Sequence, residues 1–249
     1  MSHRREHYSY ALYADPAVAG SFDERRFGGP IGELVASTQA QVVAGMIGEL
    51  RGRRILDVGT GTGRAALMFA RAGARVTAVD ASAEMLQVAR ARAAGEQISV
   101  RLLRGDAHDL QFADRSFEIA VCLRVLMHAP DWPRCLAELC RVADRLVVFD
   151  YPSAASAAAL ESLARRAKQA FGGRTEPYRV LRRGAVAHAL RRSGFRVRSV
   201  HRQFVLPIRV HRLIGSPRLT ERSERLLERA GLRRLCGSPV TVCAERCAF

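Results

Sequence analysis

Short apolar stretches rich in β-branched residues alternate with amphipathic stretches from residue 54 onward. This alternation is typical of a parallel sheet whose strands are joined by helices that cover its faces. Strands are expected at residues 55–58, 76–79, 98–103, 117–123, 146–149, 195–205 and 240–244. Helices are expected at residues 64–72, 82–94, 133–142 and 153–171, and residues 1–50 are predicted to be helical with a loop at 27–30. The pattern predicts an α/β fold with a seven-stranded sheet.

The strongest chemical signal follows the first expected strand, in the stretch ILDVGTGTGRAALMFA at residues 55–70. Gly59, Gly61 and Gly63 stand at alternate positions between a buried strand and a helix. Glycine lets the backbone approach a ligand closely, and a helix N-terminus offers N–H groups that have no partner within the helix. We therefore expect a ligand at this turn, in preference to a glycine-rich turn that binds nothing.

Aspartate ends or follows three successive expected strands, as Asp57, Asp80 and Asp106. In an open parallel sheet these strand ends meet at the ligand crevice. The spacing G-x-G-x-G differs from the dinucleotide fingerprint and from the P-loop, both of which hold phosphates. Carboxylates would repel a pyrophosphate, so we expect a cationic ligand that carries hydroxyl groups and an exocyclic amine. Taken singly, each aspartate is equally well explained as a turn or helix-cap residue.

Residues 55–150 resemble the class I S-adenosylmethionine-dependent methyltransferases. The first motif of that family is (D/E)-x-G-x-G-x-G, and it is matched here by Asp57, Gly59, Gly61 and Gly63. Residues 116–142 and the last two expected strands are similar to the subgroup that includes the ubiquinone and menaquinone biosynthesis methyltransferases. The resemblance covers most of the chain and is least specific over residues 1–50 and 151–190.

The resemblance implies S-adenosylmethionine as the cofactor and assigns its binding residues. Asp57 would lie near the methionine moiety and its ammonium group, and Asp80 would hold the ribose hydroxyls. Met85 would flank the adenine, and Asp106 with Ala107 would meet the adenine edge. The implied cofactor-binding set is completed by Thr60, Ala81 and Leu123.

The same resemblance implies the architecture. We expect a doubly wound, mostly parallel seven-stranded sheet, a Rossmann-like methyltransferase fold, with its last strand antiparallel and with an N-terminal helical cap. One domain would span residues 1–249. It would consist of the cap at 1–50, a cofactor-binding half at 51–150 and a basic acceptor-side half at 151–249, with an insertion at 206–237.

His128, just beyond the fourth expected strand, is the candidate general base for an acceptor that arrives protonated. The alternative is a structural histidine in the loop before the helix that follows Asp131. His108 is a weaker candidate, because it follows the adenine-side Asp106 and would be explained equally well by a solvent-facing position. No Asn-Pro-Pro-Tyr motif follows the fourth strand, which argues against methylation of planar amines and favours an oxygen or carbon acceptor.

Aromatic residues gather in the N-terminal segment, where a cap would exclude water from the acceptor pocket. They are Tyr8, Tyr10, Tyr13, Phe22 and Phe27. Ordinary packing of a cap on the core explains any single ring equally well. Arg25 or Arg26 is expected to reach the cofactor carboxylate.

Composition limits the protein class. With 48% hydrophobic and 26% charged residues the chain is an ordinary globular protein, and it has no apolar run long enough for a transmembrane segment. The polar start MSHRREHYSY lacks the apolar segment of a secretory signal, so a cytoplasmic location is expected. The six cysteines show no metal-binding spacing, and no metal site is predicted.

Positive charge is concentrated in the second half of the chain. The formal net charge is +16, but residues 1–150 hold 19 basic and 18 acidic residues, whereas 151–249 hold 21 basic and six acidic ones. Three interpretations compete: a solvated arginine face, an anionic partner, or RNA. The anionic partner would be a small acidic acceptor, a carrier protein or a membrane that holds the acceptor. Within this half, Thr220 is expected to cap a helix that ends near Gly231.

Together these features predict an S-adenosylmethionine-dependent methyltransferase that transfers a methyl group to a small-molecule acceptor by in-line displacement. Two alternatives remain open at this point. The first is a tRNA or rRNA methyltransferase, which is disfavoured because no basic patch is interleaved with aromatic residues. The second is a regulatory protein that binds the cofactor without turnover.

Overall fold

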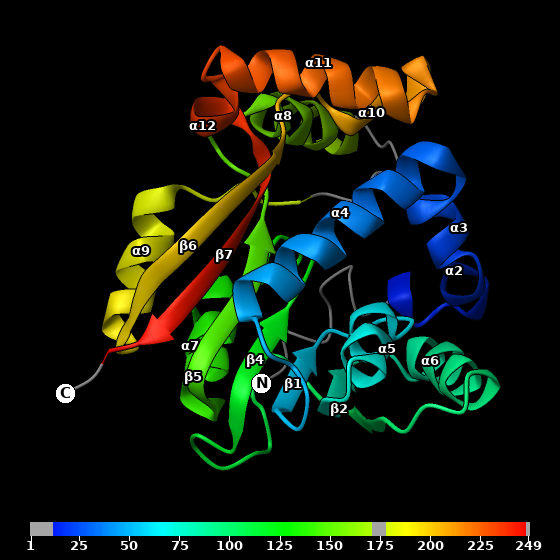
Figure 1. Ribbon diagram of the computed structural model, residues 1–249, viewed down its shortest axis with the longest axis vertical. Helices are drawn as coiled ribbons and strands as arrows, with labels where there is room; N and C mark the ends of the chain where they lie inside the picture. The colour runs from blue at the N-terminus through cyan, green and yellow to red at the C-terminus, as the bar shows by residue number, and fades with distance from the viewer. Residues whose placement is uncertain (1–11, 171–177, 248–249) are drawn as a thin grey trace.

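A single seven-stranded sheet forms the centre of the protein, in a computed structural model that describes residues 12–170 and 178–247 (Figure 1). The strand order is β3-β2-β1-β4-β5-β7-β6. All pairings from β3 to β5 are parallel, and β7 is antiparallel to both of its neighbours. The predicted fold, including the antiparallel last strand, is confirmed. The strands are β1 (Arg54–Val58), β2 (Arg75–Asp80), β3 (Arg101–Arg104), β4 (Phe117–Cys122), β5 (Ala143–Tyr151), β6 (Phe195–Phe204) and β7 (Ser238–Arg246).

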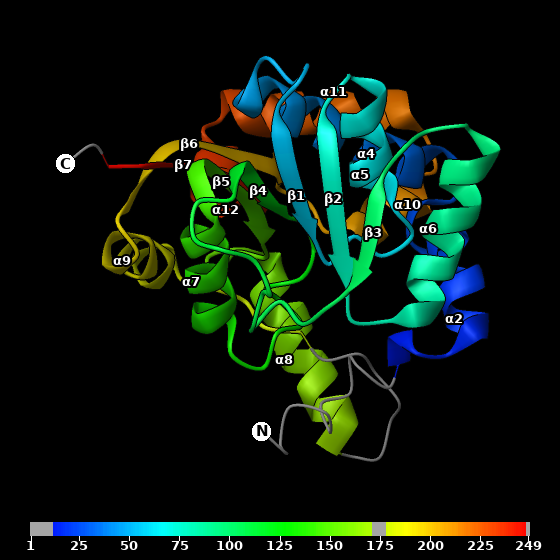
Figure 2. The ribbon, with the colours of Figure 1, turned by 90° about the horizontal axis from the view of Figure 1, so that it is seen from below.

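Helices cover both faces of the sheet, with α4 and α5 on one face and α7 and α9 on the other (Figure 2). The first helices are α2 (Pro16–Gly20), α3 (Phe22–Phe27), α4 (Gly29–Ile47), α5 (Arg64–Arg71), α6 (Ala83–Gly95) and α7 (Trp132–Val142). They are followed by α8 (Ala157–Ala170), α9 (Arg183–Arg192), α10 (Ile208–Ile214), α11 (Pro217–Arg229) and α12 (Leu232–Cys236). No helix in the described ranges is long and apolar enough to cross a membrane.

Burial on both faces explains why the central strands are apolar at consecutive positions. Ile55 and Leu56 are neighbours in β1, yet they belong to the hydrophobic clusters on opposite faces, and both are fully buried. Successive side chains of a strand point to opposite faces, so a strand covered on both sides needs an apolar residue at each position. The apolar stretches in the sequence are therefore a direct signal of this layered core.

Several element boundaries differ from those expected. Residues 98–100 do not belong to a strand, because the Ile98 N–H closes the end of α6 by donating to the Ala93 carbonyl. Residues 153–156 form a turn before α8, held by the Ala154 N–H on the Leu181 carbonyl. The expected loop at 27–30 is reduced to Gly28 between α3 and α4. Helix α9 was not predicted, since its first residue follows Arg182, whose side chain makes no cap.

The insertion between β6 and β7 forms α10, α11 and α12. The expectation that Thr220 caps the long helix of this insertion is wrong. Helix α11 begins at Pro217, and its cap is Ser216, whose side chain accepts from the Leu219 N–H. Thr220 lies one turn inside the helix and is fully buried. Both residues are good cap types, and the proline at the first helical position marks the earlier one.

Candidate functional site

The turn after β1 is fastened to the end of β2 and to the loop after β4. The N–H groups of Gly59 and Thr60 both donate to the Val79 carbonyl, at 2.7 and 3.0 Å. Gly59 has a φ of +71°, and a Cβ there would lie 2.1 Å from Cγ2 of Val125. No side chain fits in that space, so the sequence needs glycine to bring the three strand ends this close together.

A cavity of about 790 Å³ lies beside this turn. The helical segment before β1, the ends of β1 and β2, and the loops after β3 and β4 supply its walls. All predicted cofactor-binding residues except Gly63 line it: Asp57, Gly59, Thr60, Gly61, Asp80, Ala81, Met85, Asp106, Ala107 and Leu123. Gly63 instead precedes α5 and faces Ala89, where a Cβ would approach the Ala89 Cβ to 3.0 Å. The close packing of α5 on α6 therefore explains why a glycine stands at position 63.

Asp57 ends β1 as a buried carboxylate. The Thr60 hydroxyl donates to its Oδ2 at 2.7 Å, which favours the charged form. Burial outweighs that bond and raises the pKa of Asp57 to about 6, and the nearby Asp80 charge raises it further. A cation beside this group would therefore be stabilised by charge, and would in turn favour loss of the Asp57 proton.

Asp80 is held by the backbone on both of its oxygens. The Gly61 N–H donates to Oδ2 at 2.8 Å, and the Ser82 N–H donates to Oδ1 at 2.9 Å. Burial nevertheless raises the pKa of Asp80 above its ordinary value. With Asp57, it gives the cavity two fixed carboxylates on neighbouring strand ends, an arrangement suited to a ligand with a cation and hydroxyl donors.

His108 is buried and bonded, so the alternative of a solvent-facing position is wrong. Its Nδ1 lies 2.7 Å from Oδ1 of Asp106, and its Nε2 accepts from the Asp131 N–H at 3.4 Å. A ring that accepts at Nε2 and is neutral donates at Nδ1. His108 therefore fixes the Asp106 carboxylate against the start of α7.

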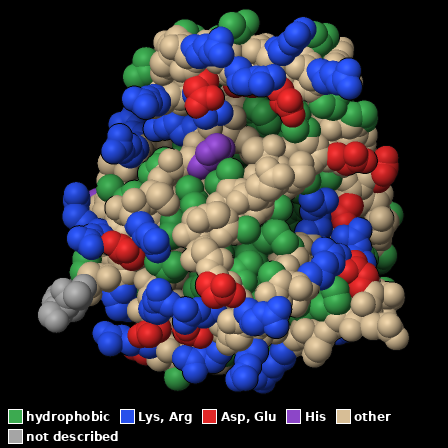
Figure 3. Space-filling view, in the orientation of Figure 1, with side chains coloured by type: hydrophobic (Ala, Val, Ile, Leu, Met, Phe, Trp, Pro, Cys, Tyr) green, Lys and Arg blue, Asp and Glu red, His purple; other side chains and the backbone are tan. Residues whose placement is uncertain are grey.

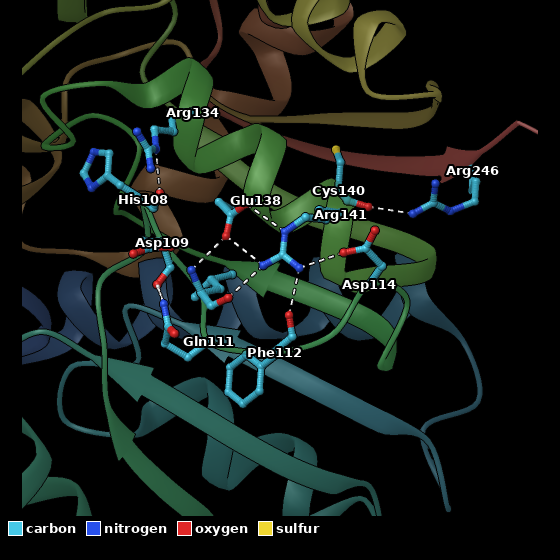
Figure 4. A network of polar contacts seen from close by, with 11 residues as sticks. His108, Asp109, Gln111, Phe112, Asp114, Arg134, Glu138, Cys140, Arg141 and Arg246 are labelled. Carbon is cyan, nitrogen blue, oxygen red and sulfur yellow. Dashed lines mark hydrogen bonds and ion pairs between the residues drawn. The ribbon is translucent and has the colours of Figure 1, made fainter.

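The loop that carries Asp106 and His108 is bound to α7 by arginines (Figure 4). Arg134 donates to the His108 carbonyl at 2.8 Å. Arg141 donates to the carbonyls of Leu110 and Phe112, each at 2.7 Å, and forms an ion pair with Glu138. These bonds satisfy the loop carbonyls without regular structure, so the end of β3 is held firmly at the cavity wall.

His128 also lines the cavity, and its side chain is half-buried. Its ring lies 6.3 Å from that of Tyr13 in an edge-on arrangement. The His108 ring holds Asp106 at the base of the cavity wall, whereas His128 stands in the loop after β4 and faces Tyr13 of the cap. Of the two histidines, His128 is the better placed to meet an acceptor.

The helices before β1 close one side of the cavity. Tyr13, Phe22 and Phe27 line it, as expected, whereas Tyr8 and Tyr10 lie outside the described residues. Asp23 of α3 fastens this cap, because it accepts from the Thr62 hydroxyl at 3.0 Å and forms an ion pair with Arg92. The Ser82 hydroxyl adds a bond of 2.7 Å to the Tyr13 carbonyl.

Arg25 and Arg26 do not line the cavity, contrary to expectation. The Arg25 guanidinium donates to the Val18 carbonyl at 3.2 Å, and that of Arg26 lies over Phe22. Two other arginines line the wall at Phe27. The guanidinium carbons of Arg64 and Arg124 lie 3.8 and 5.5 Å from the centre of its ring. Burial lowers the pKa of both arginines.

Asp150 at the end of β5 orients Arg124, a relationship that sequence analysis missed. The buried Asp150 carboxylate accepts from the Arg124 N–H and from the Gln39 amide, the latter at 2.8 Å. Arg124 has a φ of +62°, a strained backbone conformation for a residue with a side chain. Asp150 itself does not line the cavity, but its two partners do, and its position at a strand end is the signal that could have drawn attention to it.

The acceptor-side position expected for the basic second half stays a prediction. All lining residues fall between residues 13 and 130, so no described residue of 151–249 lines the cavity. Strands β7 and β6 lie beyond β5, at the edge of the sheet opposite to β2 and β3. In the described ranges, no group of three or more His, Cys, Asp or Glu side chains could hold a metal ion.

The central segment matches a known family. Residues 56–146 match the family described as "Methyltransferase domain". A demethylmenaquinone methyltransferase of Deinococcus radiodurans is 38% identical over 109 residues, which are 42% of this chain and 45% of that protein. A ubiquinone biosynthesis O-methyltransferase of Alkalilimnicola ehrlichii is 43% identical over 90 residues, 36% of each chain. The chain thus spans less than half the length of these curated relatives.

The fold is similar to that of a solved structure over nearly the full length of both chains. The crystal structure of magnesium protoporphyrin IX methyltransferase from Synechocystis PCC 6803, with bound S-adenosylhomocysteine, matches with a TM-score of 0.67. It covers 96% of this chain and 99% of that one, at 18% sequence identity. At that identity the likeness shows the fold. Residues 56–146 of this chain include the glycine turn and Asp57, Asp80 and Asp106.

Proposed function

We propose, from the premise that this chain carries a class I S-adenosylmethionine-dependent methyltransferase domain, that the protein transfers a methyl group to a small, largely apolar acceptor. One observation carries the proposal: Asp57, Asp80 and Asp106 line one cavity beside the glycine turn. Three carboxylates at neighbouring strand ends match a ligand with an ammonium group, ribose hydroxyls and an adenine amine. The relatives named for quinone biosynthesis support the same activity.

The lining fits this cofactor in its chemistry. Asp57 would face the ammonium group, Asp80 the ribose hydroxyls and Asp106 the adenine edge. Met85, Ala107 and Leu123 give the same cavity an apolar wall for a planar base. S-adenosylmethionine, when bound, supplies a methyl group that its sulfonium has already activated for transfer.

The cofactor also carries a carboxylate, and Arg64 with Arg124 would meet it. Neither forms an ion pair with a carboxylate of the described residues within 4 Å, yet both line the cavity beside Phe27. Burial raises the energetic value of a charged partner, because water screens the pair less. Asp57 would thus face the ammonium group of the methionine moiety, and the two arginines would face its carboxylate.

The protein's own part in the reaction is alignment, exclusion of water and acceptance of a proton. Tyr13, Phe22 and Phe27 cover the cavity from the cap side, and the bonds of Asp23 keep that cap closed. With an activated donor, alignment of this kind supplies much of the acceleration. His128 would accept the proton of an acidic oxygen or carbon acid in the acceptor. A quinol or another phenol fits the aromatic wall and this base.

Binding and transfer can be tested separately. Calorimetry with S-adenosylhomocysteine is expected to show one site, and Asp57→Asn with Asp80→Asn is expected to abolish that binding without loss of the fold by circular dichroism. Methyl-labelled S-adenosylmethionine is then incubated with phenols, demethylated quinols and tRNA, and each acceptor is extracted and counted. Label in a quinol or phenol supports the proposal. Label in tRNA, or tight binding without transfer to any acceptor, contradicts it.

A further inference from the structure

The outward side of α11 carries a row of arginines next to two exposed leucines. Arg218, Arg222, Arg225 and Arg229 recur every three or four residues, so they lie along one side of the helix. Leu219 and Leu226, seven residues apart, are 53% and 64% exposed. Figure 3 shows Lys and Arg side chains alternating with hydrophobic ones along the upper rim, where Figure 1 places α11. We call these six residues the α11 face.

The opposite side of α11 already supplies the packing that the insertion needs. The buried Glu224 accepts from the N–H groups of Val205 and Leu206, at 2.8 and 3.0 Å, and lies 3.0 Å from Nε2 of His211. These contacts join α11 to the end of β6 and to α10. The two exposed leucines take no part in them, so the fold gives no reason for apolar side chains on the outer face.

The four arginines of the α11 face are not neutralised by carboxylates of the described residues. No described residue of the basic half lines the cavity. Among the residues that the structure describes, none of the four arginines of the α11 face forms an ion pair with a carboxylate. Helices α10 to α12 hold eight arginines, and of their three glutamates Glu224 is buried. The surplus positive charge therefore faces outward.

We propose that the α11 face docks on an anionic lipid surface. Arginines bind phosphate headgroups, and exposed leucines beside them would enter the boundary between headgroups and acyl chains. A nucleic acid explains the arginines but not the leucines, and residues 205–237 contain no Phe, Tyr or Trp on which bases could stack. Charge and apolar area together fit a lipid surface.

The docked face would lie directly behind the cap of the cavity. The Arg212 guanidinium of α10 donates to the Arg26 carbonyl of α3 at 2.9 Å, and the Gln203 amide donates to the Val35 carbonyl of α4 at the same distance. Both contacts tie the insertion to helices that cover the site. An acceptor dissolved in the lipid would thus reach the protein beside the cap. Only this last step rests on the proposed function, and the docking itself does not.

Vesicle sedimentation with the full chain tests docking without turnover. Vesicles of phosphatidylcholine alone are compared with vesicles that also contain phosphatidylglycerol, at low and high salt. We expect binding only to the anionic vesicles, weakened by salt. Arg222→Glu with Arg225→Glu is expected to weaken it by about tenfold or more, since each basic residue near such a surface contributes severalfold. Leu219→Ser with Leu226→Ser is expected to weaken it severalfold without a change of charge.

The matched control reverses two exposed arginines elsewhere, Arg191→Glu with Arg192→Glu on α9, which lies apart from α11 in both ribbon views. It is expected to bind vesicles nearly as well as the unchanged protein. All substituted side chains are exposed and none belongs to a hydrophobic core. Melting temperatures check that each variant folds. An equal loss in the control, no loss in the leucine variant, or no binding to anionic vesicles would overturn the proposal. So would self-association or RNA binding that the α11 substitutions abolish while vesicle binding is absent.

Discussion

The N–H of Gly61 donates to Oδ2 of Asp80 at 2.8 Å, so the turn after β1 and the end of β2 form one unit. The same carboxylate accepts the Ser82 N–H at the start of α6. Asp80 therefore has two tasks in the proposed site, to fix the turn and to meet the ligand. A variant that separates these tasks tests both.

Asp80→Ala is expected to weaken S-adenosylhomocysteine binding by about 10- to 100-fold, the loss of one or two hydrogen bonds to a charged group. Asp80→Asn keeps an acceptor for the Gly61 N–H and is expected to lose less affinity and less thermal stability. Calorimetry and melting curves measure both effects. Affinity that is unchanged in Asp80→Ala would show that the carboxylate does not meet the ligand.

Binding of S-adenosylmethionine is expected to strengthen as pH rises through about 6, the raised pKa of Asp57. Below that value the carboxyl is protonated and attracts the ammonium weakly, so affinity should change by up to about tenfold per pH unit and level off above it. Calorimetry from pH 5 to 8 measures the effect. Asp57→Asn should remove this pH dependence of the affinity, apart from the part that other groups cause. If the variant kept the same pH profile, Asp57 would not be the group that meets the ammonium.

Stability without ligand should have the opposite dependence. The folded pKa of Asp57 lies above its unfolded value of 3.8, so the folded state holds the proton more tightly. Its contribution to the free energy of unfolding is complete below about pH 4 and is lost as pH rises through 6. Relative to Asp57→Asn, the unchanged protein should therefore melt at progressively lower temperature from pH 4 to 7. A difference in melting temperature that does not vary with pH would contradict the raised pKa.

The sequence predicts the strands and the first three strand-end carboxylates well, because both follow from local periodicity. Asp150 and Arg124 form a different case, since their contact depends on the pairing of β4 with β5 and on a left-handed backbone at Arg124. The antiparallel last strand is confirmed, whereas no described residue of the basic half lines the cavity, although that half was expected on the acceptor side. How the insertion packs on the cap depends on long-range contacts such as that of Arg212 with the Arg26 carbonyl, and the spacing of apolar residues does not encode them.

Arg64→Met and Arg124→Met are each expected to weaken S-adenosylhomocysteine binding by about tenfold, the loss of one charge-assisted hydrogen bond. Binding of methylthioadenosine, which lacks the amino-acid group, should not change. Arg71→Met is the matched control, because Arg71 also lines the cavity but pairs with Glu96. Equal losses for both ligands would show that the arginines shape the cavity without meeting a carboxylate.

Asp23→Ala is expected to loosen the cap, because the Thr62 hydroxyl and Arg92 both lose their partner. Faster hydrogen exchange across α2 and α3 and faster dissociation of S-adenosylhomocysteine, by about tenfold, should result. Glu24→Ala, an exposed neighbour on the same helix, is the control and should change neither. Equal exchange in both variants would show that the cap is closed by aromatic packing alone.

His128 has two tasks that can be distinguished, acceptance of a proton and edge-on packing on Tyr13. If it is the general base, His128→Ala should lower kcat by about 10²- to 10⁴-fold on the acceptor that takes label, with little change in S-adenosylhomocysteine affinity. His128→Gln, which keeps a planar polar group beside Tyr13, should be equally inactive but closer to the unchanged protein in melting temperature.

A purely structural role makes the opposite prediction. His128→Ala would then lower the melting temperature and the ligand affinity together, and His128→Gln would recover both along with kcat. His108→Ala supplies the matched comparison, because that ring holds Asp106 against α7 and is bonded at both nitrogens. It should lose stability and adenine-side affinity while kcat at saturating cofactor changes little. A loss of kcat that occurs only in the His108 variant would transfer the catalytic assignment away from His128.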